Sequence, residues 1–373
     1  MSAGEVSGDH YISSLIKALR EEGYSGELWG MGGVEAGLSG LEIKWRGDSL
    51  QVMGFTEVFS AIPRLFRLAD EIVKTIMEKK PESVVVVDSP DFHLPLIKKI
   101  RKAGYQGKIF YISPPTVWAW REYRVRTLKK YVDLCLPVFG FEHRFISERG
   151  CRSAWTGTPL LEDFYNDEAK KNEMPPFEND GKIIAFMPGS RKNEIKTLVP
   201  VMREAAEVLA SEGWTPVFSV APGLNEEVRR SYTEELRSSG FRYYEGPGKA
   251  LMKAAKCVVA ASGTITVEAL VIGCYMVVVY KINKLSEFVG RLVIKTKLFA
   301  MANILVGHEV YPELLQDNAN KEKILAEAHK WLQADDKEKE IITDELGEAR
   351  KALGNTGVYR FWAQKVMEEL ANA

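Results

Sequence analysis

Short apolar runs alternate with longer stretches of helical periodicity along most of the 373-residue chain. Apolar runs without polar alternation are typical of parallel strands that are covered on both faces. The longer amphipathic segments between them, such as 63–79 and 196–211, predict helices. We expect strands at 83–87, 108–112, 134–138, 182–187, 215–220, 257–260 and 275–280. This alternation predicts an α/β doubly wound architecture.

A polar segment at 161–181, which contains a Pro pair and ends in Gly, divides the chain into two halves of similar pattern. We therefore predict one domain over 1–165 and a second over 166–349, followed by a charged helical end. Each half is long enough to bury its own hydrophobic core.

The chain opens on a turn of small and acidic residues, with a helix predicted at 10–22. The turn holds Gly4, Glu5, Ser7, Gly8 and Asp9. Small residues before a helix let backbone N–H groups approach an anion, and the helix dipole favours it. The alternative is a tight turn that Ser7 or Asp9 caps. Almost no strand precedes the turn, so we expect either a sheet that lacks one strand or a start codon upstream of Met1.

The charge balance excludes a nucleic-acid binder that uses its whole surface. Lys plus Arg total 50 and Asp plus Glu total 51, so an anionic ligand must be held by local basic groups. The four cysteines form no CxxC pair and suit free thiols in a reducing cytoplasm. No signal peptide or membrane-spanning apolar run is evident, which leaves peripheral membrane contact open.

Two carboxylates follow the predicted strand 83–87, at the edge of the sheet where ligands of α/β proteins bind. Asp88 and Asp91 are separated by Pro90, which stiffens the turn, and are suited to acid or base catalysis. The alternative is that Asp88 caps the next helix and Asp91 is solvated. His93 is expected to pack or orient rather than to bind metal, since no HxH or HExxH pattern accompanies it. After the strand 108–112, two Pro and two Trp predict either the wall of an acyl or sugar pocket or a packed loop.

Two further strand-to-helix turns in the second half could hold a diphosphate. The first carries Gly189, Ser190 and Arg191, whose backbone and guanidinium suit phosphate oxygens. Glu194 also allows a simple helix start there. The second turn carries Ser262, Gly263 and Thr264, with Glu268 placed for ribose hydroxyls; the alternative is helix capping by Ser262 or Thr264.

An apolar stretch at 53–68 has arginines at 64 and 67 among its apolar residues. It predicts either a membrane-surface helix, apolar face down, or a core helix with two solvated arginines. The candidate membrane or acyl contacts are Val58, Phe59, Ile62, Leu65 and Phe66.

Together these motifs resemble the bacterial lipid-A-disaccharide synthase family, in order and over nearly the whole chain. The matching segments are AGEVSGD (3–9), MGFTEV (53–58), DSPDF (88–92), YISPPTVWAWR (111–121), PGSR (188–191), ASGT with the later Glu (261–268), NIL (303–305) and PELLQ (312–316). The segments AGEVSGD and SPPTVWAWR carry most of the specificity.

The resemblance implies a GT-B fold, with two Rossmann-like lobes, a central cleft and a last helix, at about 350–373, that returns to the first lobe. It implies an inverting hexosyltransferase that joins UDP-2,3-diacylglucosamine to 2,3-diacylglucosamine 1-phosphate (lipid X), with a β-1,6 linkage and release of UDP. Asp91 would be the catalytic base and Asp88 its positioning partner. Arg191, with the N–H groups of Gly263 and Thr264, would stabilise the leaving diphosphate, and Glu268 and Asn303 would be donor-site residues.

No metal or other cofactor is implied, and the resemblance places the enzyme in the cytoplasm, peripherally on the inner membrane. It allows homodimers that exchange C-terminal parts. Because both substrates are acylated, it favours the membrane interpretation of 53–68. The chain departs from the family at His93, where Asn is usual, at Thr158 in place of His, and at Ala302 in place of Pro. The alternatives are another GT-B enzyme, such as a peptidoglycan glucosaminyltransferase or a UDP-sugar epimerase, and an inactive membrane-associated sugar-nucleotide binder.

Overall fold

The computed structural model describes residues 1–50, 55–166, 181–281 and 298–372. The chain forms two compact units, one of Met1–Pro159 with Asn355–Ala373 and the other of Leu160–Gly354. The sequence pattern had placed these junctions after residues 165 and 349. Within the described ranges, no helix is long and apolar enough to cross a membrane.

The first unit is built on a six-stranded parallel sheet with the order β3-β2-β1-β4-β5-β6. Its strands are β1 (Ser2–Ala3), β2 (Trp29–Gly32), β3 (Glu42–Arg46), β4 (Ser83–Val87), β5 (Lys108–Ile112) and β6 (Leu134–Leu136). Its helices are α1 (Val6–Glu21), α2 (Val34–Leu38), α3 (Phe55–Lys79), α4 (Pro90–Lys102), α5 (Val125–Tyr131), α6 (Gly140–Glu148) and α17 (Val358–Ala371), with 3-10 turns η1 (Gly47–Leu50) and η2 (Glu122–Arg124).

The second unit repeats this plan with the order β12-β11-β10-β7-β8-β9. Its strands are β7 (Ile183–Met187), β8 (Thr215–Ser219), β9 (Arg242–Tyr244), β10 (Cys257–Ala261), β11 (Met276–Tyr280) and β12 (Glu313–Leu315). Its helices are α9 (Lys192–Ser211), α10 (Glu226–Ser238), α11 (Gly248–Ala254), α12 (Ile265–Ile272), α14 (Met301–Val306), α15 (Lys321–Leu332) and α16 (Asp336–Lys351), with the 3-10 turn η3 (Gln316–Asn318); α7 (Pro159–Asn166) lies at the junction.

All seven predicted strands are present, whereas the expected gap in the first sheet is not. The two-residue strand β1 lies in the middle of that sheet, where Ser2 pairs with Met31 of β2 and Val86 of β4. The helix α1 begins at Val6, earlier than predicted. The predicted linker is in part the helix α7, and its residues 167–180 lie outside the described residues. All four cysteines are unpaired, in agreement with the expected free thiols.

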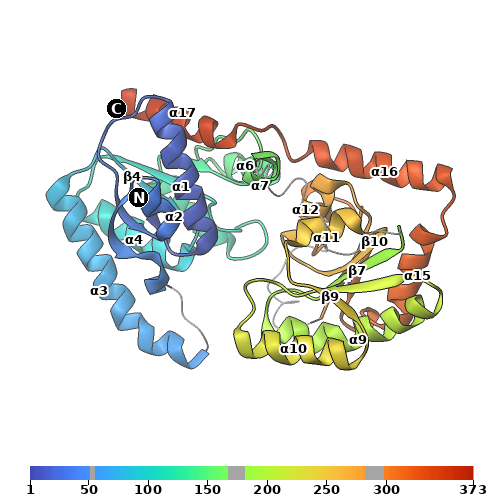
Figure 1. Ribbon diagram of the computed structural model, residues 1–373. Helices are drawn as coiled ribbons and strands as arrows, with labels where there is room; N and C mark the ends of the chain where they lie inside the picture. Colours follow the sequence, from blue (N-terminus) through green and yellow to red (C-terminus); the bar gives the residue numbers. More distant parts are fainter. Residues whose placement is uncertain (51–54, 167–180, 282–297, 373) are drawn as a thin grey trace. The chain divides into compact units, whose positions relative to one another are not determined.

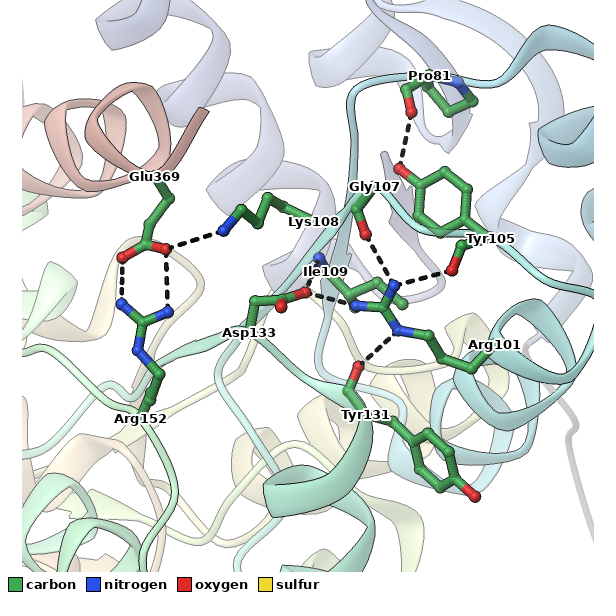
Figure 2. Close-up of polar contacts among 10 residues, drawn as sticks. All are labelled: Pro81, Arg101, Tyr105, Gly107, Lys108, Ile109, Tyr131, Asp133, Arg152 and Glu369. Atoms are coloured by element: carbon green, nitrogen blue, oxygen red, sulfur yellow. Dashed lines mark hydrogen bonds and ion pairs between the residues drawn. The ribbon is translucent and has the colours of Figure 1, made fainter. Parts of the chain in front are cut away.

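The last helix, α17, belongs to the first unit and packs beside α1 (Figure 1). Trp362 is 1% exposed, and its ring meets those of Tyr11 and Tyr359 edge to face at 5.7 and 5.5 Å. At the end of the same helix, Glu369 forms ion pairs with Arg152 and with Lys108 of β5 (Figure 2). Apolar burial and charge pairing therefore both hold the C-terminal helix to the first sheet.

The helix α4, which follows the turn with the two candidate carboxylates, is held at its C-terminal end by Arg101. Its guanidinium donates to the carbonyls of Tyr105, Gly107 and Tyr131 and to the carboxylate of Asp133, as Figure 2 shows. These bonds tie the C-terminal end of α4 to the loop that leads into β5 and to the loop that leads into β6. The helix that follows the turn at Asp88 is therefore anchored at its other end.

Truncation of Trp362 should destabilise the first unit specifically. We expect Trp362→Ala to lower its free energy of unfolding by about 3–5 kcal/mol, because the change leaves a cavity in a close-packed core. Hydrogen exchange of the β4 and β5 amides measures this unit alone. The matched control is Phe361→Ala, a partly buried aromatic on the same helix, for which a smaller loss is expected. Unchanged protection in β4 and β5 after Trp362→Ala would contradict the packing described.

Candidate active site

The turn between β4 and α4 has an unusual backbone conformation. Asp88 and Ser89 have φ angles of 50° and 44°, a left-handed conformation that non-glycine residues adopt at a cost. The carbonyl of Asp88 accepts hydrogen bonds from Tyr111 Oη at 2.9 Å and from His93 Nδ1 at 2.7 Å. These two buried donors fix the turn from which Asp91 projects.

His93 is fully buried and serves as a link within this turn. Because Nδ1 donates to the Asp88 carbonyl, Nε2 is the acceptor for the hydroxyl of Ser2, at 2.8 Å. Burial lowers the pKa of His93 to about 4, against the opposing effect of the Asp88 hydrogen bond, so the ring is neutral at physiological pH. These contacts agree with the packing and orienting role expected of His93.

Asp91 lies in the first turn of α4 with its side chain 72% exposed. Its Oδ1 accepts from Arg121 Nη1 at 2.9 Å and from Arg124 Nη2. Asp91 is thus not simply solvated. Asp88 makes no helix cap either, since Ser89 is the N-cap of α4; burial and the nearby charge of Glu5 raise the pKa of Asp88.

The segment between β5 and α5 supplies these two arginines and packs through its two tryptophans. The guanidinium of Arg121 lies over the ring of Trp120, 4.1 Å from its centroid. Trp118 meets Phe141 edge to face at 5.0 Å and donates from Nε1 to Glu142 at 3.2 Å. The packed-loop alternative describes this segment, with Trp120 37% exposed at its tip.

Glu142 is a buried carboxyl that the sequence pattern did not single out. It lies at the start of α6, 7% exposed, and accepts from Trp118 Nε1 and from the backbone N–H of Phe139, both at 3.2 Å. Burial raises the pKa of Glu142 to about 7, although these hydrogen bonds oppose the shift, and the charge of Asp88 adds to it. A buried carboxyl that titrates near neutrality beside the candidate site is a recognised mark of functional regions.

An apolar groove of about 780 Å³ opens between α3 and α4, next to Asp91. The apolar residues that α3 and α4 contribute to it include Ile62, Leu65, Phe66, Ala69, Phe92 and Pro95. Glu5 and Ser7, from the N-terminal turn, also line the groove. Hence the groove joins the candidate catalytic carboxylate of Asp91 to an apolar surface, in a volume of the size that ligand pockets have.

The helix α3 changes character along its length. Ile62 is 39% exposed and Phe66 56%, whereas Ile72 and Ile76 are buried in the core. Its second half is therefore an ordinary core helix, whereas Ile62 and Phe66, in the part before it, present apolar side chains. Val58 and Phe59 lie in the same helix, but their side chains are outside the described residues.

Of the N-terminal turn, Asp9 has a different role from the one expected. Its carboxylate accepts from the N–H groups of Gly33 at 2.6 Å, Glu35 at 3.0 Å and Ala36 at 3.3 Å. Asp9 thus caps the short helix α2 and not its own helix, whose N-cap is Glu5. Gly4 is required by close packing, since a Cβ there would lie 2.3 Å from Leu50; Gly8 packs on Ala3 in the same way, at 3.0 Å.

In the second unit, the turn at 188–191 is closed by its own helix. The carboxylate of Glu194 accepts from the N–H groups of Ser190 at 3.0 Å and of Arg191 at 3.1 Å, and the tight turn relies on Gly189 at a φ of 105°. The helix-start alternative therefore describes these N–H groups. The phosphate cradle expected at this turn is occupied by the carboxylate of Glu194 in the structure. The guanidinium of Arg191 remains 83% exposed, paired with Glu194.

The second turn of this unit is open. Gly263 is exposed, and no heavy atom of the described residues lies within 4 Å of the position of a Cβ. Ser262 donates to the carbonyl of Phe299, and Thr264 makes no side-chain cap within the described chain, so the capping alternative is excluded. Glu268 lies one turn into α12, and burial raises its pKa against the opposing charge of Lys249.

Asn303 does not have the direct role expected of it. It is fully buried, and its amide donates to Tyr311 O and Glu313 Oε1 and accepts from the N–H groups of Val310 and Tyr311. All of its hydrogen-bonding capacity is used within the protein. Glu313 also accepts from the N–H groups of Phe299 and Ala300, so this pair shapes the segment that Ser262 contacts.

The two strand orders define the class of protein. Each sheet has the order 3-2-1-4-5-6 when its strands are numbered within the unit, the arrangement of nucleotide-binding doubly wound domains. Two such units, with polar turns at the carboxyl ends of their central strands, form a GT-B fold. The fold is similar to that of UDP-GlcNAc 2-epimerase from Methanocaldococcus jannaschii (TM-score 0.61, 13% identity, 100% of this chain and 98% of that chain). It is also similar to that of UDP-GlcNAc 2-epimerase from Neisseria meningitidis bound to UDP-GlcNAc (TM-score 0.58, 11% identity, 98% of both chains).

The family is shown by sequence. A family model described as lipid-A-disaccharide synthetase matches residues 1–364. The lipid-A-disaccharide synthase of Myxococcus xanthus is 34% identical over 375 residues, which cover 99% of this chain and 96% of that relative. This chain belongs to the lipid-A-disaccharide synthase family. It is a hexosyltransferase of lipid A biosynthesis that acts on substrates of the UDP-sugar type.

The titration of Glu142 should appear in the pH dependence of stability. Its pKa is higher in the folded chain than its ordinary value of 4.5, so the folded state binds the extra proton between about pH 4.5 and 7 and stability falls as pH rises through this window. Glu142→Gln removes this slope at the cost of one acceptor. We expect the variant to gain about 1–3 kcal/mol relative to the parent between about pH 5 and 8, measured by urea unfolding.

The control for this prediction is Glu148→Gln, which changes an exposed carboxyl on the same helix. Its stability relative to the parent should not vary over the same window. If Glu142→Gln and Glu148→Gln gave the same pH profile, the raised pKa of Glu142 would be contradicted.

Proposed function

We propose that the chain joins UDP-2,3-diacylglucosamine to 2,3-diacylglucosamine 1-phosphate and releases UDP, with inversion at the anomeric carbon. The observation that carries this choice is the position of Asp91 at the mouth of the apolar groove. A carboxylate beside an apolar groove suits an acceptor whose reacting hydroxyl and acyl chains must be held together. The family supports the reaction class.

In the proposed reaction, Asp91 takes the proton of the acceptor 6-hydroxyl while that oxygen bonds to the donor C1. The bond between C1 and the diphosphate oxygen breaks, and UDP leaves with the electron pair. Arg191, exposed at the start of α9, and the open turn at Gly263 would stabilise the developing charge on the diphosphate. Asp88 holds the turn through its carbonyl, which makes it a positioning partner.

We further propose that no metal or other cofactor takes part. Guanidinium and backbone N–H groups supply the charge stabilisation that a metal would otherwise give, and the donor turns carry no acidic pair of DxD type. Turnover should therefore persist in EDTA.

Asp91→Asn should abolish transfer and leave UDP binding near that of the parent, because the base acts on the acceptor. Loss of a positioned base costs about 10²–10⁴-fold in turnover. Disaccharide formation in EDTA and the Kd of UDP are the measurements. Arg191→Ala is the counterpart, for which weaker UDP binding is expected. Equal loss of UDP affinity in both variants would defeat this division of roles.

We also propose that the exposed apolar side chains of Ile62 and Phe66 on α3 contact the cytoplasmic face of the inner membrane, where acylated substrates reside. Ile62 and Phe66 are exposed beside the exposed Arg64 and Arg67, which suit anionic head groups.

Phe66→Asp should lower the partitioning of the protein onto anionic phospholipid vesicles roughly tenfold, since an inserted Phe contributes about 1.5–3 kcal/mol. Co-sedimentation with vesicles measures it. Ile341→Asp, an equally exposed apolar position on α16, is the control and should leave partitioning unchanged. Parallel losses in both variants would point away from a local membrane contact.

A further inference from the structure

Two arginines hold the carboxylate of Asp91. Arg121 and Arg124 both donate to the same oxygen, Oδ1, so the contact restrains the side chain on the side of the two guanidiniums. A base must reach the hydroxyl whose proton it takes, and release of Asp91 from the arginines would give its carboxylate that freedom.

Two guanidiniums share one carboxylate in this cluster. Arg121 and Arg124 share the one carboxylate of Asp91, while Glu122, between them in sequence, is paired with Arg149 at 2.8 Å. A singly charged carboxylate therefore faces two cations. An anion with more charge and more oxygens would bind the same two groups more strongly.

Both guanidiniums are held in place before any ligand arrives. Arg124 has only 9% of its side chain exposed, and Arg121 stacks on Trp120 from a left-handed backbone position with a φ of 51°. A fixed, planar and weakly hydrated guanidinium can donate to two oxygens of one phosphate. Little ordering entropy would be lost when a phosphate binds.

The place of the cluster matches the chemistry of the proposed acceptor. Asp91 is at the rim of the apolar groove, so a glycolipid with its acyl chains in the groove has its sugar beside the arginines. On a glucosamine ring, C1, which bears the phosphate, and C5, which bears the 6-hydroxymethyl group, flank the ring oxygen. A carboxylate beside a bound 1-phosphate is therefore on the side of the ring that carries the 6-hydroxyl.

We propose that Arg121 and Arg124 bind the phosphate of the acceptor, and that this phosphate displaces the Asp91 carboxylate from them. The inference rests on the proposed function, because it takes the acceptor from it. The displaced carboxylate is then free to take the proton of the 6-hydroxyl. Activation of the base is thus coupled to binding of the phosphorylated acceptor, and a glycolipid without phosphate leaves the base restrained.

Binding of two matched glycolipids to the full chain tests this. The probes are 2,3-diacylglucosamine 1-phosphate and the same diacylglucosamine without phosphate, each titrated in detergent micelles. Asp91→Asn removes the competing charge, so it should tighten binding of the phosphorylated probe about 5- to 10-fold and leave the other unchanged. Arg121→Ala should weaken the phosphorylated probe about 10-fold or more, again selectively.

The control is Arg126→Ala, at an exposed arginine in the first turn of the following helix α5, and this variant should bind both probes as the parent does. Arg121 is chosen over Arg124 for truncation because its side chain is more exposed, 38% against 9%, so folding is less affected. Unchanged or weaker binding of the phosphorylated probe by Asp91→Asn would overturn the proposal. So would an equal effect of Arg121→Ala on both probes.

The two proposals fail separately. Selective binding without disaccharide formation by the parent chain would leave the phosphate site standing and remove the proposed function. Disaccharide formation with binding that ignores the phosphate would do the reverse.

Discussion

The carbonyl of Asp88 is the acceptor on which the candidate site depends. It takes hydrogen bonds from two buried donors, Tyr111 on β5 and His93 on α4, and these hold Asp88 and Ser89 in a left-handed conformation. His93 in turn is fixed by Ser2 of the central strand β1. The strain of the turn, about 1–3 kcal/mol for each such residue, is thus offset by bonds to β5 and α4 and, through His93, to β1. As a result, Asp91 is presented at one defined point of the rim of the groove.

The charged side chains around Asp91 do not pair one for one. Two arginines contact its exposed carboxylate, and a second carboxyl, that of Glu142, is buried against Trp118 of the segment that carries these arginines. The apolar groove adjoins the same point. An acylated, phosphorylated acceptor has an apolar part and an anionic part. The groove and the two arginines complement these two parts. The fold alone would not make this distinction, since epimerases of UDP-GlcNAc have the same fold.

The sequence pattern predicted the buried strands well, because a strand covered on both faces must be a continuous apolar run. It missed β1, β2, β3, β9 and β12, which are short, rich in glycine or partly exposed, so that no such run is needed. Site residues were harder to predict, because their roles depend on partners distant in sequence or on local geometry. Asp9 caps a helix more than twenty residues away, Glu194 closes the turn expected to be open, and Asn303 is saturated by a loop that follows it. In the sequence, Glu142 is only an acidic residue that follows an apolar strand. Its burial could not be predicted, because it depends on packing against residues distant in sequence, such as Trp118.

The most direct test of the account is transfer by the purified chain. UDP-2,3-diacylglucosamine and 2,3-diacylglucosamine 1-phosphate would be supplied together in detergent with EDTA, and UDP and lipid product measured in the same samples. The account predicts a β-1,6-linked disaccharide 1-phosphate and UDP in equal amounts, with both products dependent on the acceptor. Release of UDP without disaccharide, or transfer that stops in EDTA, would contradict it.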